Sequence, residues 1–159
     1  MSIENFFSDF EKQGKESEER KKLILEAKEK EAAKEQAFLD DYKNYYAQTL
    51  KPELEKIGEK LSSKFEVEID EEPTIAQGRH YYSKIKLVPK FDNYVKKVSI
   101  SLTAESGREL ITMSGEYDNA KGQSNNEGIY GFQEDVPTFK QLNIEEQISK
   151  ILGQVFIKK

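Results

Sequence analysis

The chain has 159 residues, 30 of them acidic and 25 basic, so it has the size of a single domain and a net charge of −5. Charged residues make up 35% of the sequence, against about 25% in an average protein. With no cysteine and one histidine, the sequence excludes disulfides, thiol nucleophiles, cysteine-based zinc sites and histidine-rich metal sites.

The beginning of the chain bears on where the protein works. Residues 1–10 lack the basic start and the apolar run of a signal peptide. No stretch of the sequence approaches the roughly 18 consecutive apolar residues that a membrane-spanning helix needs. We therefore expect a cytoplasmic protein that does not contact membranes.

Apolar residues are distributed unevenly along the chain. Residues 1–49 contain 9 Leu, Ile, Val and Phe, whereas residues 50–159 contain 30. A packed core needs buried apolar area to offset the conformational entropy that folding costs. We therefore predict a charged helical arm over residues 1–49 and a compact α+β domain over residues 50–159.

The arm opens with apolar side chains at helical spacing, namely Ile3, Phe6, Phe7 and Phe10. Gly14 is expected to end this first short helix. Residues 11–36 then contain 16 charged side chains, eight of each sign. Acidic residues precede basic ones by four positions, as in Glu16 and Arg20, which is the favourable order on a helix surface. This pattern predicts a solvated helix.

A second set of aromatic side chains follows in the arm, consisting of Phe38, Tyr42 and Tyr45. A seven-residue repeat runs beside it through Leu25, Ala32, Leu39 and Tyr46. Lys28 and Glu35 fall at the intermediate positions of this repeat, where a coiled coil needs apolar residues. The pattern allows a short, imperfect coiled coil or a helix docked on another surface, and it does not support a long leucine zipper.

Pro52 suits the first position of a helix. The apolar stripe of that helix consists of Leu50, Leu54, Ile57 and Leu61. This spacing predicts an amphipathic helix with one face on the core. The sequence leaves open whether Pro52 kinks one long helix or separates two helices.

After Ser63 the apolar period changes to two, which is typical of strands with one buried face. Strands are predicted at residues 65–69, 81–87, 97–103 and 111–117, with a short fifth strand at 129–132. Residues 71–78 and 118–128 are rich in polar and turn-forming residues and are predicted to be loops. The short links between strands indicate an antiparallel meander with one wet face.

Pro137 is expected to lead into a final helix, with Asn143 as its N-cap and Glu146 three residues later. The predicted fold is therefore α+β. It consists of N-terminal helices (a charged arm plus an amphipathic helix), a four- to five-stranded antiparallel meander and a C-terminal helix.

Catalytic and metal-binding patterns are not found. His80, the only histidine, is more typical of a strand-edge residue than of a ligand. The polar loop that begins at Asp118 lacks the oxygen ligands of a calcium-binding EF-hand, since Ala120 and Gly122 occupy ligand positions. The glycine-rich phosphate-binding motifs are missing as well. We therefore predict a protein that is not an enzyme and has no cofactor and no metal.

The leading hypothesis is a non-catalytic protein–protein interaction or adaptor protein, whose partner is another protein or a second copy of itself. Aromatic side chains are favoured in interface cores. The candidate anchors in the arm are Phe6, Phe7, Phe10, Phe38, Tyr42 and Tyr45. The alternative for these residues is that they pack back onto the domain.

Two other functions remain open. Residues 79–97 contain six basic residues and one acidic residue, and Tyr82, Lys84, Lys86 and Lys97 are expected to share the wet face of the sheet. A basic, aromatic face is one way to bind single-stranded nucleic acid. The negative net charge disfavours this hypothesis, and the lysines also have Glu66 and Glu68 as cross-strand partners. The other alternative is a small apolar ligand bound between the sheet and the final helix.

Overall fold

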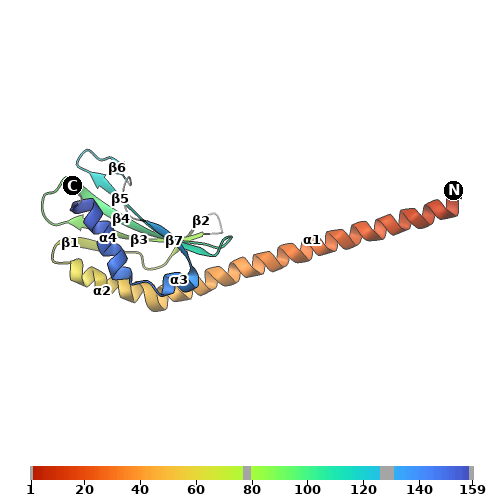
Figure 1. The fold of residues 1–159 in the computed structure, drawn as a ribbon, viewed down its shortest axis with the longest axis horizontal. Coiled ribbons are helices and arrows are strands. Elements are labelled where there is room, and N and C mark those ends of the chain that lie inside the picture. Colours follow the sequence, from red (N-terminus) through yellow and green to blue (C-terminus); the bar gives the residue numbers. More distant parts are fainter. Residues whose placement is uncertain (1, 77–79, 126–130, 158–159) are drawn as a thin grey trace. The chain divides into compact units, whose positions relative to one another are not determined.

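The computed structural model describes residues 2–76, 80–125 and 131–157 (Figure 1). The chain divides into two compact units, Met1–Ala37 and Phe38–Lys159. The boundary between them falls within one helix, α1, which covers Ile3–Tyr45.

The first unit consists of the helical residues of α1 up to Ala37, and the side chains from Ser2 to Lys34 are all exposed. The prediction that Gly14 ends a short helix is wrong, because α1 continues through it. One glycine costs a helix only about 1 kcal/mol, which the surrounding strong helix formers offset. The charge pattern adds local support, for example between Glu16 and Arg20, whose charged groups are 4.0 Å apart.

The second unit follows the order of helix, sheet and helix. Its helical elements after α1 are the π-helix η1 (Tyr46–Leu50), α2 (Lys51–Leu61), α3 (Val136–Lys140) and α4 (Ile144–Phe156). Its strands are β1 (Phe65–Ile69), β2 (Thr74–Ala76), β3 (His80–Pro89), β4 (Val95–Glu105), β5 (Leu110–Asn119), β6 (Ser124–Asn125) and β7 (Phe132–Asp135). The predicted α+β class is confirmed.

The helical path is continuous from α1 into α2, which answers the question that Pro52 left open. Pro52 lies in the first turn of α2, directly after the π-helix η1. Its ring would clash with the carbonyl of the residue four positions earlier in a regular α-helix. At this point of the chain the helix has the wider turn of η1. In this turn the Lys51 N–H donates to the Tyr46 carbonyl.

The sheet is an antiparallel meander whose edge strands are each broken in two. The strand order is β1-β3-β4-β5-β6, with β2 also paired to β3 and β7 to β5. β1 and β2 pair with successive parts of β3, at residues 85–89 and 80–82 respectively. β7 and β6 pair with β5 in the same way, at residues 110–113 and 117–118. The four- to five-stranded meander is therefore present, with interrupted edges.

Several boundaries differ from the prediction. β2 lies within the predicted loop at residues 71–78, and β6 lies within the predicted loop at 118–128. The last strand begins at Phe132; residues 129 and 130, where the sequence predicted its start, lie outside the described residues. Pro137 belongs to a separate short helix, α3, rather than to α4. The edge strands β2 and β6 and the helix α3 are too short to show an apolar period in the sequence.

The hydrophobic core lies between one face of the sheet and a helical layer in which α2 and α4 pack side by side (Figure 1). Cross-strand register places Ile85 beside Ile100 and Leu87 beside Val98 on this face. The predicted N-cap of α4 is confirmed, since the Asn143 side chain accepts a hydrogen bond from the Glu146 N–H at 3.1 Å. The cap fixes where α4 begins and so sets its apolar stripe against the sheet.

The end of α1 also belongs to the core, so the compact unit begins earlier than predicted. Phe38, Leu39 and Tyr42 are at most 8% exposed and belong to the same cluster as the sheet residues. The compact unit therefore begins at Phe38, twelve residues before the predicted boundary at residue 50. The count of Leu, Ile, Val and Phe did not reveal this earlier boundary, because it leaves out tyrosines. Tyr42 and Tyr46 are two of the residues that close this end of the core.

Two helical glycines give a matched test of the packing of α2 against β1. A Cβ at Gly58 would meet Val67 Cγ1 at 3.1 Å, whereas a Cβ at Gly153 in α4 would have nothing within 4 Å. Gly153→Ala is expected to stabilise the domain by about 1 kcal/mol through helix propensity. Gly58→Ala should gain less or lose stability, because Val67 must move. Equal gains in the free energy of unfolding, measured with urea, would contradict this packing.

Candidate functional site

The arm carries large apolar side chains in the open. They form two groups, with exposed fractions of 68% for Ile3, 51% for Phe6, 55% for Phe7 and 64% for Phe10, and of 65% for Leu23, 56% for Ile24 and 57% for Leu25. Exposed apolar residues are ordinary when scattered singly, but clusters of them mark interaction sites. We call the first group the phenylalanine cluster and the second the leucine cluster.

In the phenylalanine cluster, the ring of Phe6 contacts the rings of both Phe7 and Phe10. The Phe6 ring stacks on the Phe10 ring with centroids 5.9 Å apart and an interplanar angle of 23°. Phe6 also lies 5.9 Å from the ring of Phe7. Contacts between successive turns of the helix therefore pre-arrange three rings that remain half exposed. A partner can cover them without much further ordering of their side chains.

The leucine cluster was not among the predicted anchors. It interrupts a charged segment with three consecutive apolar residues, Leu23, Ile24 and Leu25. Such a run on an exposed helix is unfavourable unless it has a function. That run is the sequence signal by which these residues could have been found.

The other three predicted anchors lie in the domain and not in the open. Phe38 and Tyr42 are 8% and 3% exposed and are part of the core. Tyr45 is partly buried, with its ring edge-on to Phe139 at 6.5 Å and the Lys140 ammonium 5.0 Å from its centre. The alternative, that the aromatic residues pack back onto the domain, therefore applies to these three and not to Phe6, Phe7 and Phe10.

The predicted basic face exists, but acids are interleaved with its lysines. Tyr82, Lys84 and Lys86 lie at alternate positions of β3, on the face opposite the core. Cross-strand register places Lys86 beside Glu68 and Lys97 beside Asp118. A groove of about 350 Å³ on this face is lined by Glu66, Val67, Glu68, Lys86, Val88 and Lys97. Arg79, which contributed to the basic segment, lies outside the described residues.

This interleaving gives nucleic-acid binding little electrostatic support. Binding of a polyanion depends on uncompensated basic side chains that replace the counterions of the phosphates. On this face Glu68 and Asp118 repel phosphates next to Lys86 and Lys97. The middle rows of the face carry hydroxyl groups, with Ser101 beside Lys84 and Thr103 beside Tyr82. Aromatic stacking is thus available from Tyr82 alone among the four predicted residues.

The nucleic-acid hypothesis is open to a direct titration. We expect a labelled single-stranded oligonucleotide to show no salt-sensitive binding to the full chain between low and physiological salt. Lys84→Glu combined with Lys86→Glu should leave the titration unchanged. Binding that weakens with salt and is lost in the double variant would revive this function.

His80 occupies the first position of β3, opposite Ala76 on one side and Glu105 on the other. Glu105 is engaged by Arg108, whose guanidinium donates a hydrogen bond of 2.7 Å to its carboxylate. This hydrogen bond lowers the pKa of Glu105. Within the part of the chain that the structure describes, no three His, Asp or Glu side chains are grouped so that they could hold a metal ion.

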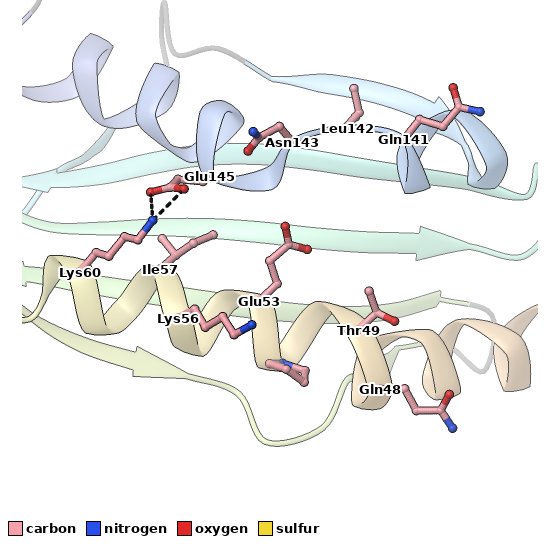
Figure 2. A pocket seen from close by; sticks show the side chains of 11 residues that line it. Gln48, Thr49, Glu53, Lys56, Ile57, Lys60, Gln141, Leu142, Asn143 and Glu145 are labelled. Atoms are coloured by element: carbon pink, nitrogen blue, oxygen red, sulfur yellow. Dashed lines mark hydrogen bonds and ion pairs between the residues drawn. The ribbon is translucent and has the colours of Figure 1, made fainter.

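A polar groove of about 710 Å³ lies between α2 and the segment that joins α3 to α4 (Figure 2). Lys60 reaches across it and donates hydrogen bonds of 2.8 and 3.1 Å to the two carboxylate oxygens of Glu145. Glu53, Lys56, Gln141 and Asn143 also line it, so its chemistry suits polar groups. The expected apolar-ligand pocket gains no support from this groove.

The interface between the sheet and α4, where that pocket was expected, is filled with side chains. Ile144, Ile148 and Ile151 of α4 are at most 1% exposed and pack in the core with the sheet. These apolar side chains pack against one another and against the sheet. They, and not a ligand, therefore occupy the interface.

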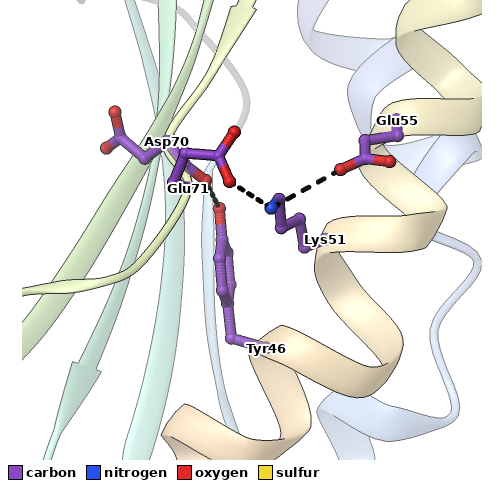
Figure 3. A network of polar contacts seen from close by, with 5 residues as sticks. All are labelled: Tyr46, Lys51, Glu55, Asp70 and Glu71. Carbon is purple, nitrogen blue, oxygen red and sulfur yellow. Dashed lines mark hydrogen bonds and ion pairs between the residues drawn. The ribbon is translucent and has the colours of Figure 1, made fainter.

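Another polar network joins η1 to the corner between β1 and β2 (Figure 3). The Tyr46 hydroxyl donates a hydrogen bond of 2.6 Å to the Asp70 carbonyl. Lys51 pairs with Glu71 and lies 3.8 Å from Glu55. The hydrogen bond to Glu71 raises the pKa of Lys51, and burial raises the pKa of Tyr46 to about 12. The network positions the broken edge strand and is structural in character.

The raised pKa of Tyr46 predicts alkaline destabilisation. The folded state favours the neutral phenol, so its contribution is fully present below the ordinary pKa of 10.0 and is lost as the pH rises from there to about 12. Urea unfolding from pH 8 to pH 12 should show this loss. Tyr46→Phe should cost about 1 kcal/mol at pH 8 and flatten the alkaline decline. Parallel declines in both proteins would contradict this assignment.

Compared with protein-family models, with curated proteins and with solved structures, the chain matches none of them. In the described ranges, no helix has the length and apolar character needed to cross a membrane. The function of the protein is therefore inferred from its own residues.

Proposed function

We propose that the protein is a non-catalytic interaction or adaptor protein of the cytoplasm, whose helical arm binds a protein partner. The observation that carries the proposal is the phenylalanine cluster, in which the Phe6 ring contacts those of Phe7 and Phe10 and each ring is at least half exposed on a charged helix. The compact unit contributes a stable α+β platform with its own core.

The energetics of the arm support a partner. A helix without tertiary contacts is only marginally stable in water, since most helical stability in proteins comes from packing of an apolar face. Burial of a phenylalanine side chain contributes about 1.5–3 kcal/mol. Covering Phe6, Phe7 and Phe10 would therefore stabilise both the complex and the helix. Aromatic residues in such clusters are the usual anchors of interfaces.

Site-specific photo-crosslinking in the native host tests this proposal. A photoreactive phenylalanine analogue at Phe7 should capture a protein, because Phe7 lies within the phenylalanine cluster. The same analogue at Lys12, on the opposite side of the helix, is the matched control and should capture little.

Deletion of residues 1–36 provides the second arm of the test. It removes no buried side chain, so the melting temperature of the remaining chain should stay within a few degrees of the full chain. The deletion should abolish the contacts captured at Phe7. A shortened chain that keeps every protein contact of the full chain would overturn the proposal.

A further inference from the structure

We infer that the arm's partner is a second copy of the arm, bound antiparallel about a centre between Lys15 and Glu16. This inference rests on the proposed function and identifies its partner. Three features of the first unit support it: the helix face that the two apolar clusters share, the small side chains midway between them, and the distribution of charge.

Part of each apolar cluster lies on one shared face of the helix. A helical residue turns about 100° relative to its predecessor, so residues 18 positions apart point in the same direction. Phe6 is therefore aligned with Ile24, and Phe7 with Leu25. These two rows bound one face about 100° wide. Leu23 points to the opposite side, although it is as exposed as Ile24. One straight partner helix can therefore cover the shared face, without Leu23.

An antiparallel second copy brings unlike clusters together. With the centre between residues 15 and 16, Phe6 and Phe7 of one copy lie beside Ile24 and Leu25 of the other. The same contacts recur at the other end because the pairing is two-fold symmetric. Phe6, Phe7, Ile24 and Leu25 of both copies are then covered at once.

The centre of the pairing has small side chains on the shared face. Gly14 of one copy lies opposite Ser17 of the other, so two helices can approach closely where they cross. The structure leaves room there, since nothing lies within 4 Å of a Cβ built on Gly14. A glycine in the middle of an exposed helix, otherwise a cost, is thereby explained.

Charge selects the antiparallel orientation. Residues 4–11 contain three acids (Glu4, Asp9 and Glu11) and no base, a net charge of −3. Residues 20–27, which lie opposite them in the antiparallel pairing, contain three bases (Arg20, Lys21 and Lys22) and one acid (Glu26), a net charge of +2. Antiparallel pairing sets these segments against each other twice, whereas parallel pairing sets like against like. Opposite potentials fix register and orientation in an interface.

Sedimentation equilibrium of the full chain over a range of concentrations tests the pairing. The wild type should associate as a dimer. Ile24→Glu should weaken the dimer by about tenfold or more, because it places a charge against Phe7. Leu23→Glu adds the same charge one residue away on the opposite side and should change the dissociation constant by about twofold at most. A wild type that stays monomeric, or equal effects of the two variants, would overturn the inference.

Orientation is tested with spin labels, for which the cysteine-free sequence is suited. A label at Asn5→Cys lies on the outer side of the pair and should be about 35 Å from its copy in the antiparallel dimer, given a rise of 1.5 Å per residue, and about 20 Å in a parallel one. The short distance would overturn the antiparallel arrangement.

The outcomes separate this inference from the proposed function. If the chain is monomeric but Phe7 captures a different protein in the host, the proposed function stands and self-association falls. If the chain is monomeric and removal of the arm changes no contact, both fall. Far-UV circular dichroism of each variant confirms that the helix and the domain remain folded.

Discussion

The fold depends on keeping one apolar stripe aimed at the sheet over the end of α1, η1 and α2. Tyr42, Tyr46, Leu50 and Leu54 follow one another at intervals of four residues and are all nearly fully buried. In a regular α-helix each such interval turns the stripe by about 40°, so the fourth residue would point away from the sheet. The wider π turn at Tyr46–Leu50 rotates less per residue and corrects this drift.

The same helix serves two purposes along its length. From Phe38 onward its apolar residues face the core of the compact unit, and the Tyr46 hydroxyl is bound by the backbone at Asp70. Before Ala37 its stability comes from charge pairs and helix propensity, and its apolar clusters are left exposed. Ordered phenylalanine rings that stay exposed outside a stable domain are the basis of the proposed interaction function. That is why the proposed function is assigned to the arm.

Much of the fold could be predicted because its signals are local. The two-residue period of the main strands and the cap at Asn143 depend on near neighbours in the sequence, and both were right. The π turn, the broken edge strands and the burial of Phe38 and Tyr42 depend on tertiary contacts, which local patterns do not contain. The candidate site divides in the same way. Phe6, Phe7 and Phe10 followed from helical spacing, whereas Tyr45 could be placed against Phe139 only by the fold.

Hydrogen exchange of the full chain, followed amide by amide at several protein concentrations, tests the central division of the chain most directly. The account predicts that Phe38–Leu61 and the sheet stay strongly protected at every concentration. In dilute samples, amides of residues 3–34 should exchange orders of magnitude faster than those of the core. Their protection should increase as the protein concentration rises. An arm that is as protected as the core in the most dilute sample, or a Phe38–Leu50 segment that exchanges freely, would contradict it.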